Sequence, residues 1–165
     1  MKCLIFSDSH NYPYHMEKAI LKNPDTELVF FLGDGLSDLE ELYYRFPKIK
    51  FLPVKGNCDF RFIVCGEAVS KTGEINICGK RIVYTHGDLY GAKYGKTGLC
   101  DLARSRFADI VLFGHTHVPE VEYVNEDERP YYLFNPGSAG IRTGSFGIMT
   151  LSEGCEPLFS HGNFV

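Results

Sequence analysis

The sequence predicts an α/β fold in which two sheets pack together and helices lie outside. Two observations carry this prediction. In the first third of the chain, short apolar strands alternate with amphipathic helices, a pattern typical of parallel strands in a doubly wound sheet. The second half consists mostly of strand-like segments separated by glycine turns, which favours antiparallel hairpins.

The first half is organised around the apolar run at residues 28–32. Five consecutive apolar residues are too few for a typical helix, so they predict a strand buried on both faces. Ser37 is a candidate cap for the next helix, with Glu40 as the capping-box acid. In order, we expect a strand at 2–7, a helix at 15–22, a strand at 28–32, a helix at 38–45 and a strand at 50–54.

The second half is predicted to be rich in strands. Gly73 and the pair Gly79-Lys80 separate the first three of them and indicate hairpins. The expected strands lie at 61–69, 74–78, 81–85, 110–113, 120–124, 131–134, 146–151 and 155–160, with a helix at 99–107. Neither a repeat nor a linker interrupts the 165 residues, so we expect one domain at 1–165.

Composition narrows the class of protein. Apolar residues make up 44% and charged residues 23%, which is ordinary for a globular protein. The net charge of −4 argues against a broad nucleic-acid-binding face, and the apolar runs fall far short of the roughly 20 residues that span a bilayer. No secretion signal opens the chain. We therefore expect a cytoplasmic protein without membrane contact, whose six cysteines are reduced and mostly buried.

Side chains that can bind metal ions follow five of the predicted strands. They are Asp8 and His10, Asp34, Asn57 and Asp59, His86, and His115 and His117. In an extended segment residues i and i+2 point the same way, so each of the pairs 8/10 and 115/117 can reach one site. Taken alone, Asp34 could cap a helix and Asn57 could belong to a turn. Together, imidazoles and carboxylates at successive strand ends predict a site for a divalent transition metal.

The motifs resemble those of the calcineurin-like metallophosphoesterase family. They are Asp8-Ser9-His10, Gly33-Asp34, Gly56-Asn57-Cys58-Asp59, Thr85-His86-Gly87 and Gly114-His115-Thr116-His117, in the family's order. The chain length and Asn135-Pro136-Gly137-Ser138 resemble its small prokaryotic phosphodiesterase subgroup. The resemblance implies a four-layer αββα sandwich of two mixed sheets flanked by helices, and a binuclear metal site.

The resemblance also assigns the ligands. By it, Asp8, His10, Asp34 and His117 hold one metal, and Asp34, Asn57, His86 and His115 hold the other, with Asp34 as the bridge. Mn is the expected metal, with Ni, Co, Fe or Zn as alternatives. Two such ions, two aspartates and a bridging hydroxide would leave a charge of about +1, which attracts a phosphodiester monoanion. The implied function is hydrolysis of phosphodiesters by that hydroxide.

The chain departs from the family at Cys58, where many members have the histidine of G-N-H-D/E. A thiol, with an ordinary pKa of about 8.5, is a poorer acid at neutral pH than an imidazolium. The subgroup commonly shows G-N-C-D, so the change is compatible with an active enzyme. We expect catalytic contributions from Asn57, Cys58 and Asp59, with Asp59 orienting a ligand or a water molecule.

Two further residues are candidate substrate contacts, and each has an ordinary surface role as its alternative. Tyr12 could stack on a nucleoside or aryl group, and Arg142 could bind a phosphate oxygen. The expected partner is a small phosphodiester, and the aromatic residues are compatible with a homo-oligomer. Two alternatives stay open for the function: a non-catalytic scaffold like the related retromer subunit, which lacks part of the metal shell, and a phosphomonoesterase or nuclease. Retention of every ligand position favours the hydrolase.

Overall fold

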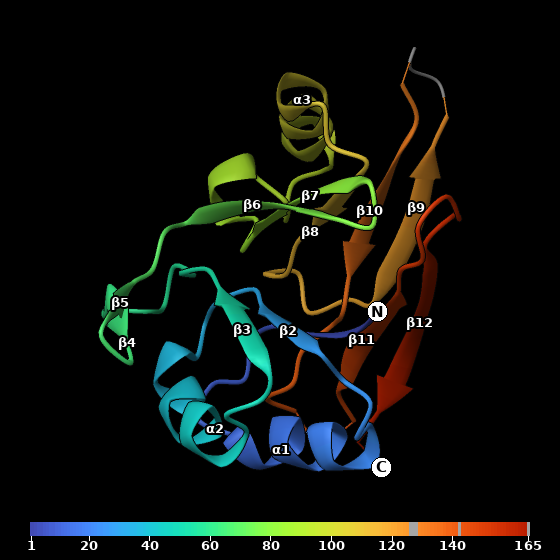
Figure 1. The fold of residues 1–165 in the computed structure, drawn as a ribbon. Helices are drawn as coiled ribbons and strands as arrows, with labels where there is room; N and C mark the ends of the chain where they lie inside the picture. Colours follow the sequence, from blue (N-terminus) through green and yellow to red (C-terminus); the bar gives the residue numbers. More distant parts are fainter. Residues whose placement is uncertain (126–128, 142, 165) are drawn as a thin grey trace.

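The computed structural model describes residues 1–125, 129–141 and 143–164 (Figure 1). Two five-stranded mixed sheets pack against each other, with α1 and α2 on one outer side and α3 on the other. The strand orders are β12-β11-β1-β2-β3 and β6-β7-β8-β10-β9. The predicted fold, two mixed sheets flanked by helices, is confirmed.

The first sheet contains the doubly wound beginning of the chain. Its elements are β1 (Lys2–Phe6), α1 (Pro13–Lys22), β2 (Leu28–Phe31), α2 (Leu39–Arg45), β3 (Lys50–Pro53), β11 (Ser145–Thr150) and β12 (Leu158–Asn163). β1, β2 and β3 are parallel, in the register Cys3 to Leu28 and Leu28 to Lys50. β11 pairs antiparallel with β1, and β12 with β11. The carboxyl ends of the three parallel strands therefore meet at one edge.

The second sheet is built from the middle of the chain. Its elements are β6 (Thr72–Ile77), β7 (Lys80–Thr85), α3 (Thr97–Arg106), β8 (Ile110–Leu112), β9 (Glu120–Val124) and β10 (Tyr131–Asn135). β8 is parallel to both of its neighbours, β7 and β10, which again brings the carboxyl ends of three strands to a common edge. β6 forms the predicted hairpin with β7, and β9 pairs antiparallel with β10.

Alternating side chains of the strands divide the core into three layers. Leu4 and Phe6 of β1 pack on the side of α1 and α2, whereas Cys3 and Ile5 pack between the sheets. The inter-sheet layer is completed from the second sheet by residues such as Leu112. The third layer lies between the second sheet and α3. All four residues of β2 are buried, as expected for a strand covered on both faces.

Two local predictions were wrong. Residues 61–69 form a short hairpin of β4 (Ile63–Val64) and β5 (Glu67–Ala68) instead of one strand. Cys65 and Gly66 both adopt positive φ between them, the conformation of a tight hairpin turn. Ser37 does not cap a helix: it lies inside the 3₁₀ turn η1 (Leu36–Asp38), which precedes α2 without a side-chain cap. A second 3₁₀ turn, η2 (Asp88–Tyr90), follows β7.

The six thiols are free, but the expectation that they are mostly buried was wrong. Cys3 is buried, Cys78 and Cys100 are half-buried, and the other three, Cys58, Cys65 and Cys155, are exposed. These three lie in loops and turns, where no sheet covers them. Among the helices of the described residues, none has the length and apolarity that crossing a membrane requires.

Candidate metal centre

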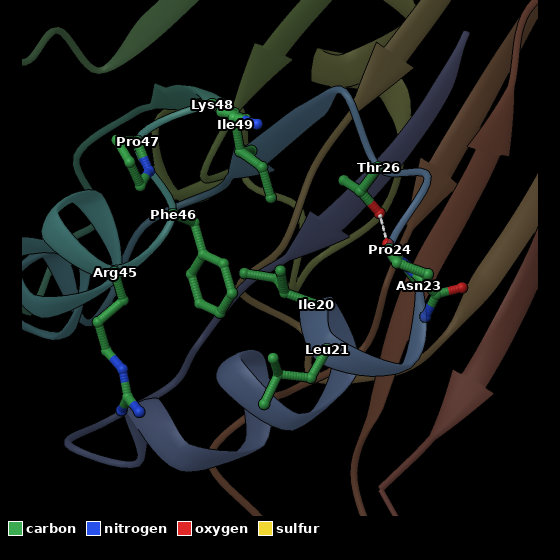
Figure 2. A pocket seen from close by; sticks show the side chains of 10 residues that line it. All are labelled: Ile20, Leu21, Asn23, Pro24, Thr26, Arg45, Phe46, Pro47, Lys48 and Ile49. Carbon is green, nitrogen blue, oxygen red and sulfur yellow. Dashed lines mark hydrogen bonds between the residues drawn. The ribbon is translucent and has the colours of Figure 1, made fainter.

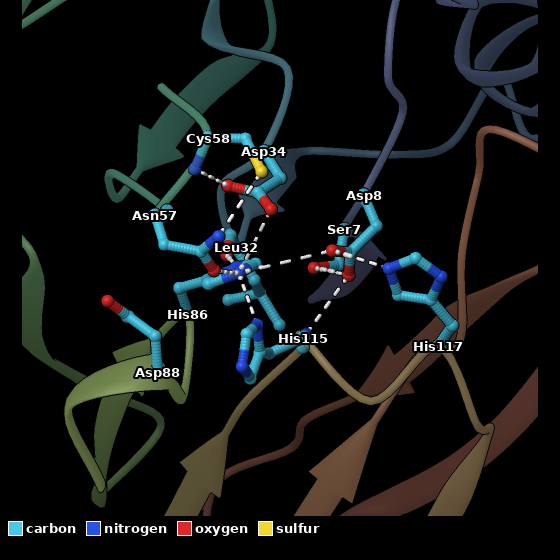
Figure 3. A network of polar contacts seen from close by, with 12 residues as sticks. Ser7, Asp8, Leu32, Asp34, Asn57, Cys58, His86, Asp88, His115 and His117 are labelled. Carbon is cyan, nitrogen blue, oxygen red and sulfur yellow. Dashed lines mark hydrogen bonds and ion pairs between the residues drawn. The ribbon is translucent and has the colours of Figure 1, made fainter. Parts of the chain in front are cut away.

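The predicted ligands come together where strand ends of the two sheets meet (Figure 3). Asp8 follows β1, Asp34 follows β2 and Asn57 follows β3 in the first sheet, while His86 follows β7 and the histidine pair follows β8 in the second. Six of the side chains form two groups of three, and within each group the ligand atoms lie within 4.8 Å of one another. The groups are Asp8, His10 and His117, and Asp34, His86 and His115.

The first group is centred on the fully buried carboxylate of Asp8. Its Oδ1 lies 3.1 Å from Nε2 of His117 and 3.9 Å from Nε2 of His10. Its Oδ2 accepts hydrogen bonds from the Ser7 hydroxyl (2.6 Å) and from the backbone N–H of His115 (3.1 Å). The hydrogen bond with Asp8 raises the pKa of His117 above that of a free imidazole. One oxygen of Asp8 is thus fixed by the protein, and the other faces two imidazoles.

The second group converges on Nε2 of His86. The Nδ1–H of His86 donates a hydrogen bond to the Leu32 carbonyl at 2.7 Å, which orients the ring. Nε2 then lies 3.3 Å from Oδ2 of Asp34, and close to two further atoms: Oδ1 of Asn57 at 3.1 Å and Nδ1 of His115 at 3.1 Å. Because oxygen acceptors surround this nitrogen, either a proton or a cation must lie among them.

Burial and ion pairing have opposite effects on the pKa values of Asp34 and His86. Burial alone would raise the pKa of Asp34, but hydrogen bonds from His86 and from the Cys58 backbone hold that pKa well below its ordinary range. Burial alone would lower the pKa of His86, and the two aspartates Asp34 and Asp8 raise it instead. Burial and the neighbouring His86 lower the pKa of His115.

The donor set fits a pair of divalent cations. Asp8 and Asp34 are buried, and in the described part of the chain their ion pairs are with histidines and not with lysine or arginine. Buried carboxylates need a positive partner, and carboxylate with imidazole is a donor set that Mn, Fe, Co, Ni and Zn accept. The two groups also adjoin, since Nε2 of His86 lies 4.0 Å from Oδ1 of Asp8.

The ligands reach the site by turns and not by the extended segments that we expected. Five of them adopt left-handed backbone conformations: Asp8 (φ 56°), His10 (45°), Asp34 (58°), His115 (67°) and His117 (62°). Aspartate and histidine adopt this region more readily than most residues. As a result the pair 115/117 does not act as a unit, because His115 joins one group and His117 the other.

A glycine contact allows the loops after β2 and β3 to approach each other. A Cβ at Gly56 would lie 2.1 Å from Oδ1 of Asp34, and one at Gly33 would lie 2.5 Å from the Gly56 nitrogen. Any larger residue at position 56 would therefore displace the Asp34 carboxylate. Gly33 also adopts a φ of 94°, which other residues reach only with strain.

The carboxylate of Asp59, which we expected to orient a ligand or water, accepts hydrogen bonds from backbone N–H groups. Its Oδ2 accepts from the N–H of Asp34 at 2.8 Å and of Gly56 at 2.9 Å. Its Oδ1 accepts from the N–H of Gly35 at 2.8 Å and of Leu36 at 2.9 Å. Asp59 thus holds the backbone that carries Asp34.

Asn57 and Cys58 both lie beside the second group. The backbone N–H of Cys58 donates to Asp34 at 2.7 Å, and the amide of Asn57 donates to the Cys58 sulfur at 3.2 Å. Desolvation, followed by the neighbouring Asp34, raises the pKa of the Cys58 thiol to about 11. The thiol is therefore protonated at neutral pH.

Sequence reasoning missed the residues that support the ligand loops. Asn135 donates from its amide to the Gly114 carbonyl (2.9 Å) and to the Thr116 hydroxyl (3.0 Å), which braces the turn of His115 and His117. The Ser138 hydroxyl donates to the Asp8 carbonyl at 2.9 Å. The motif at 135–138 was the available signal, but only as part of the resemblance.

Of the two candidate substrate contacts, the structure describes Tyr12 but not Arg142. Tyr12 is 57% exposed and stacks on His15, with ring centroids 6.1 Å apart. His15 also hydrogen bonds to the Ala139 carbonyl at 2.7 Å. Arg142 lies outside the described residues.

A pocket of about 350 Å³ lies elsewhere, beside the end of α1 and the segment that leads into β3 (Figure 2). Ile20 and Leu21 of α1 face Phe46 and Ile49 across it. It adjoins the amino ends of β2 and β3, whereas the candidate ligands follow the carboxyl ends. This pocket contains none of the candidate ligands.

Comparison with known proteins gives concordant matches. The model of the calcineurin-like phosphoesterase superfamily domain matches residues 1–154. The chain is 33% identical over 158 residues to the probable metallophosphoesterase YsnB of Bacillus subtilis, covering 93% of this chain and 86% of that protein. It is 28% identical over 107 residues to the phosphodiesterase YfcE of Escherichia coli, covering 61% of this chain and 52% of that protein.

The fold is also similar to that of solved structures. The structure of Vps29 from Entamoeba histolytica complexed with Zn²⁺ matches with a TM-score of 0.72 and 20% identity, covering 100% of both chains. At this level of identity the likeness concerns the fold.

Proposed function

The chain belongs to the calcineurin-like phosphoesterase superfamily, and we propose on that basis that it is a phosphodiesterase that depends on two divalent metal ions. The observation that carries this proposal is the pair of three-residue ligand groups at one edge of the sandwich. Imidazole nitrogens and carboxylate oxygens make up both groups, and Mn²⁺ is the metal that we propose for them.

Each of the two ligand groups would bind one of the two proposed metal ions. Asp8, His10 and His117 would hold one ion. Asp34, His86 and His115 would hold the other, with Asn57 as a further ligand, because its Oδ1 also faces Nε2 of His86. We propose Asp34 as the ligand shared by both ions. When bound, two such ions would lower the pKa of a water molecule between them and neutralise charge developing on the phosphoryl oxygens.

The side chains themselves supply position and charge. The hydrogen bond from His86 to Leu32 directs Nε2 into the site, and the bonds from Ser7 and the His115 backbone leave one oxygen of Asp8 directed at the histidines. Fixed ligands hold reacting groups in the geometry of attack, so little reorganisation remains for the reaction itself. The protonated thiol of Cys58 beside Asp34 is a weak acid, which favours substrates whose leaving group needs no proton.

A non-catalytic scaffold is the second candidate, and the likeness to Vps29 favours it. Because the Vps29 structure from Entamoeba histolytica is a complex with Zn²⁺, metal binding alone does not distinguish the two candidate functions. Turnover does. The complete pair of ligand groups supports the phosphodiesterase.

The decisive experiment is hydrolysis of bis(p-nitrophenyl) phosphate by chelator-stripped protein to which Mn²⁺ is returned. Asp34→Asn, assayed in parallel, keeps the shape of the side chain but removes its charge. We expect turnover that requires Mn²⁺ and that the variant loses. Failure of the wild-type protein to turn over with Mn²⁺, Ni²⁺ or Co²⁺, although metal is bound, would favour the scaffold.

Substrate class is tested with the same protein. We propose small phosphodiesters, and p-nitrophenyl phosphate serves as the monoester comparison. Higher kcat/KM for the monoester than for the diester would replace the proposal with a phosphomonoesterase.

A further inference from the structure

Two aspartates outside the ligand groups accept hydrogen bonds from the loops that carry the ligands. Asp38 is buried at the end of η1, and its Oδ2 accepts from the Ser9 hydroxyl at 2.6 Å and from the Asn11 backbone N–H at 3.0 Å. These two residues flank His10. Asp59 is half-buried after β3, and both of its oxygens accept from backbone N–H groups on either side of the site, including that of Asp34.

We propose that Asp38 and Asp59 are positioning residues, each for a different metal. Asp38 would position the group of Asp8, His10 and His117 through residues 9–11, and Asp59 would position the group of Asp34, His86 and His115 through the backbone of residue 34. This inference rests on the proposed binuclear centre.

Backbone conformation explains why such positioning is needed. His10 and Asn11 have φ values of 45° and 71°, and Asp34 has a φ of 58°. Asparagine, aspartate and histidine adopt this region more readily than other non-glycine residues, but it is still less favourable than the α and β regions, so contacts with the surroundings must stabilise it. Hydrogen bonds to a carboxylate are about twice as strong as those between neutral groups, so one aspartate can hold a turn in this conformation. Without it the turn would relax and the ligand that it carries would leave its position.

The two aspartates differ in how they would tolerate replacement by asparagine. Asp38 uses one oxygen for both of its bonds, and an amide oxygen can do the same. Asp59 uses both oxygens, with two N–H donors on each. An amide at position 59 would direct its NH₂ group at two N–H groups. Asp38→Asn should therefore preserve metal binding, and Asp59→Asn should impair it nearly as much as Asp59→Ala.

The test measures Mn²⁺ affinity in two backgrounds that each keep one ligand group. His115→Ala keeps the first group and His117→Ala keeps the second; free Mn²⁺ is followed by electron paramagnetic resonance. Asp38→Ala should weaken binding roughly 10- to 100-fold in the first background and much less in the second. Asp59→Ala should do the reverse. Equal losses in both backgrounds, or none, would overturn the assignment.

Amide hydrogen exchange of the chelator-stripped single variants gives a readout that needs no metal. Asp59→Ala should speed exchange at the N–H groups of residues 34–36 and 56 at least 10-fold, and Asp38→Ala should do so at Asn11, with core amides unchanged as the check on folding. Unchanged exchange at these positions would reject the positioning roles even if no background bound Mn²⁺. Wild-type protein that bound fewer than two Mn²⁺ while these amides responded would instead count against the proposed binuclear centre.

Discussion

Oδ1 of Asp8 lies 3.1 Å from Nε2 of His117, although 109 positions separate the two residues along the chain. His115 is only two positions from His117, yet its ring contacts His86 in the other ligand group. The left-handed conformations of both histidines produce this division. Each of the two histidines therefore reports on a different proposed metal.

Single replacements of the two histidines should each remove one metal. Mn²⁺ bound per chain should fall from about two to about one in both His115→Ala and His117→Ala, because three-residue groups lose a third of their donors. Metal analysis after equilibrium dialysis measures this. His15→Ala, which removes a histidine that hydrogen bonds to the Ala139 carbonyl, is the matched control and should keep two. Loss of both metals from either variant would contradict the division into groups.

The candidate ligands that lie together in the structure could be selected from the sequence because their signal is local. A motif that follows a buried strand identifies both a side chain able to bind metal and its position at the end of that strand, as with Asp34 after β2 and His86 after β7. Parallel strands then bring these ends to one edge without further information. The same logic predicted the two sheets and the helices outside them.

The remaining features depend on contacts that leave no pattern in the sequence. The i, i+2 argument assumed extended backbone, whereas Asp8 and His117 lie in turns with positive φ. The pair 8/10 still shares one ligand group, but the pair 115/117 is divided between the two. Asp59 accepts four hydrogen bonds from backbone N–H groups, which every residue type except proline provides. Asp38 accepts one such bond and one from the Ser9 hydroxyl. The hairpin at 63–68 depends on the conformations of Cys65 and Gly66.

Protons should compete with metal at the histidines whose pKa values are raised. Both His86 and His117 have raised pKa values, so the folded protein binds these protons more tightly than the unfolded chain does. Their contribution to stability is complete below the ordinary pKa of about 6.5 and is lost as pH rises through the raised values. Asp34, whose pKa is lowered, contributes constantly at these pH values because its contribution is lost only in acid.

Thermal unfolding in the presence of a chelator tests this competition. The Tm of the stripped protein should fall as pH rises above about 6.5, and Mn²⁺ should restore it increasingly at high pH, where the imidazoles are neutral ligands. His117→Gln should show a weaker fall because one of the two histidines is removed. A Tm of the stripped protein that rises over this range would contradict the directions given for His86 and His117.

Gly56→Ala should impair the site through one contact. The new Cβ would lie 2.1 Å from Oδ1 of Asp34, so the carboxylate or the loop must move. We expect a loss of about 1–3 kcal/mol in the free energy of unfolding and a fall in kcat/KM on the order of 100-fold. Denaturant titration and the diester assay measure the two effects.

Gly79→Ala is the matched control for that replacement. Gly79 has a φ of 75° and open space around its Cβ position, so it reports backbone strain without a clash. It should cost about 1–2 kcal/mol and leave kcat/KM unchanged. If Gly56→Ala behaved in the same way, the close approach to Asp34 would not matter for the reaction.

Cys58→His should change which esters are cleaved. The Cys58 thiol, with a pKa of about 11, cannot match an imidazolium as a proton donor at neutral pH. The wild-type protein should therefore cleave aryl diesters well and alkyl diesters slowly. A histidine at position 58 should narrow the ratio of the two kcat/KM values by about 10-fold or more, because a general acid contributes most where the leaving group is poor. Cys58→Ser, which supplies a hydroxyl and no usable acid, is the control and should leave the ratio unchanged. A ratio that also stayed constant in Cys58→His would mean that the leaving oxygen receives its proton from elsewhere.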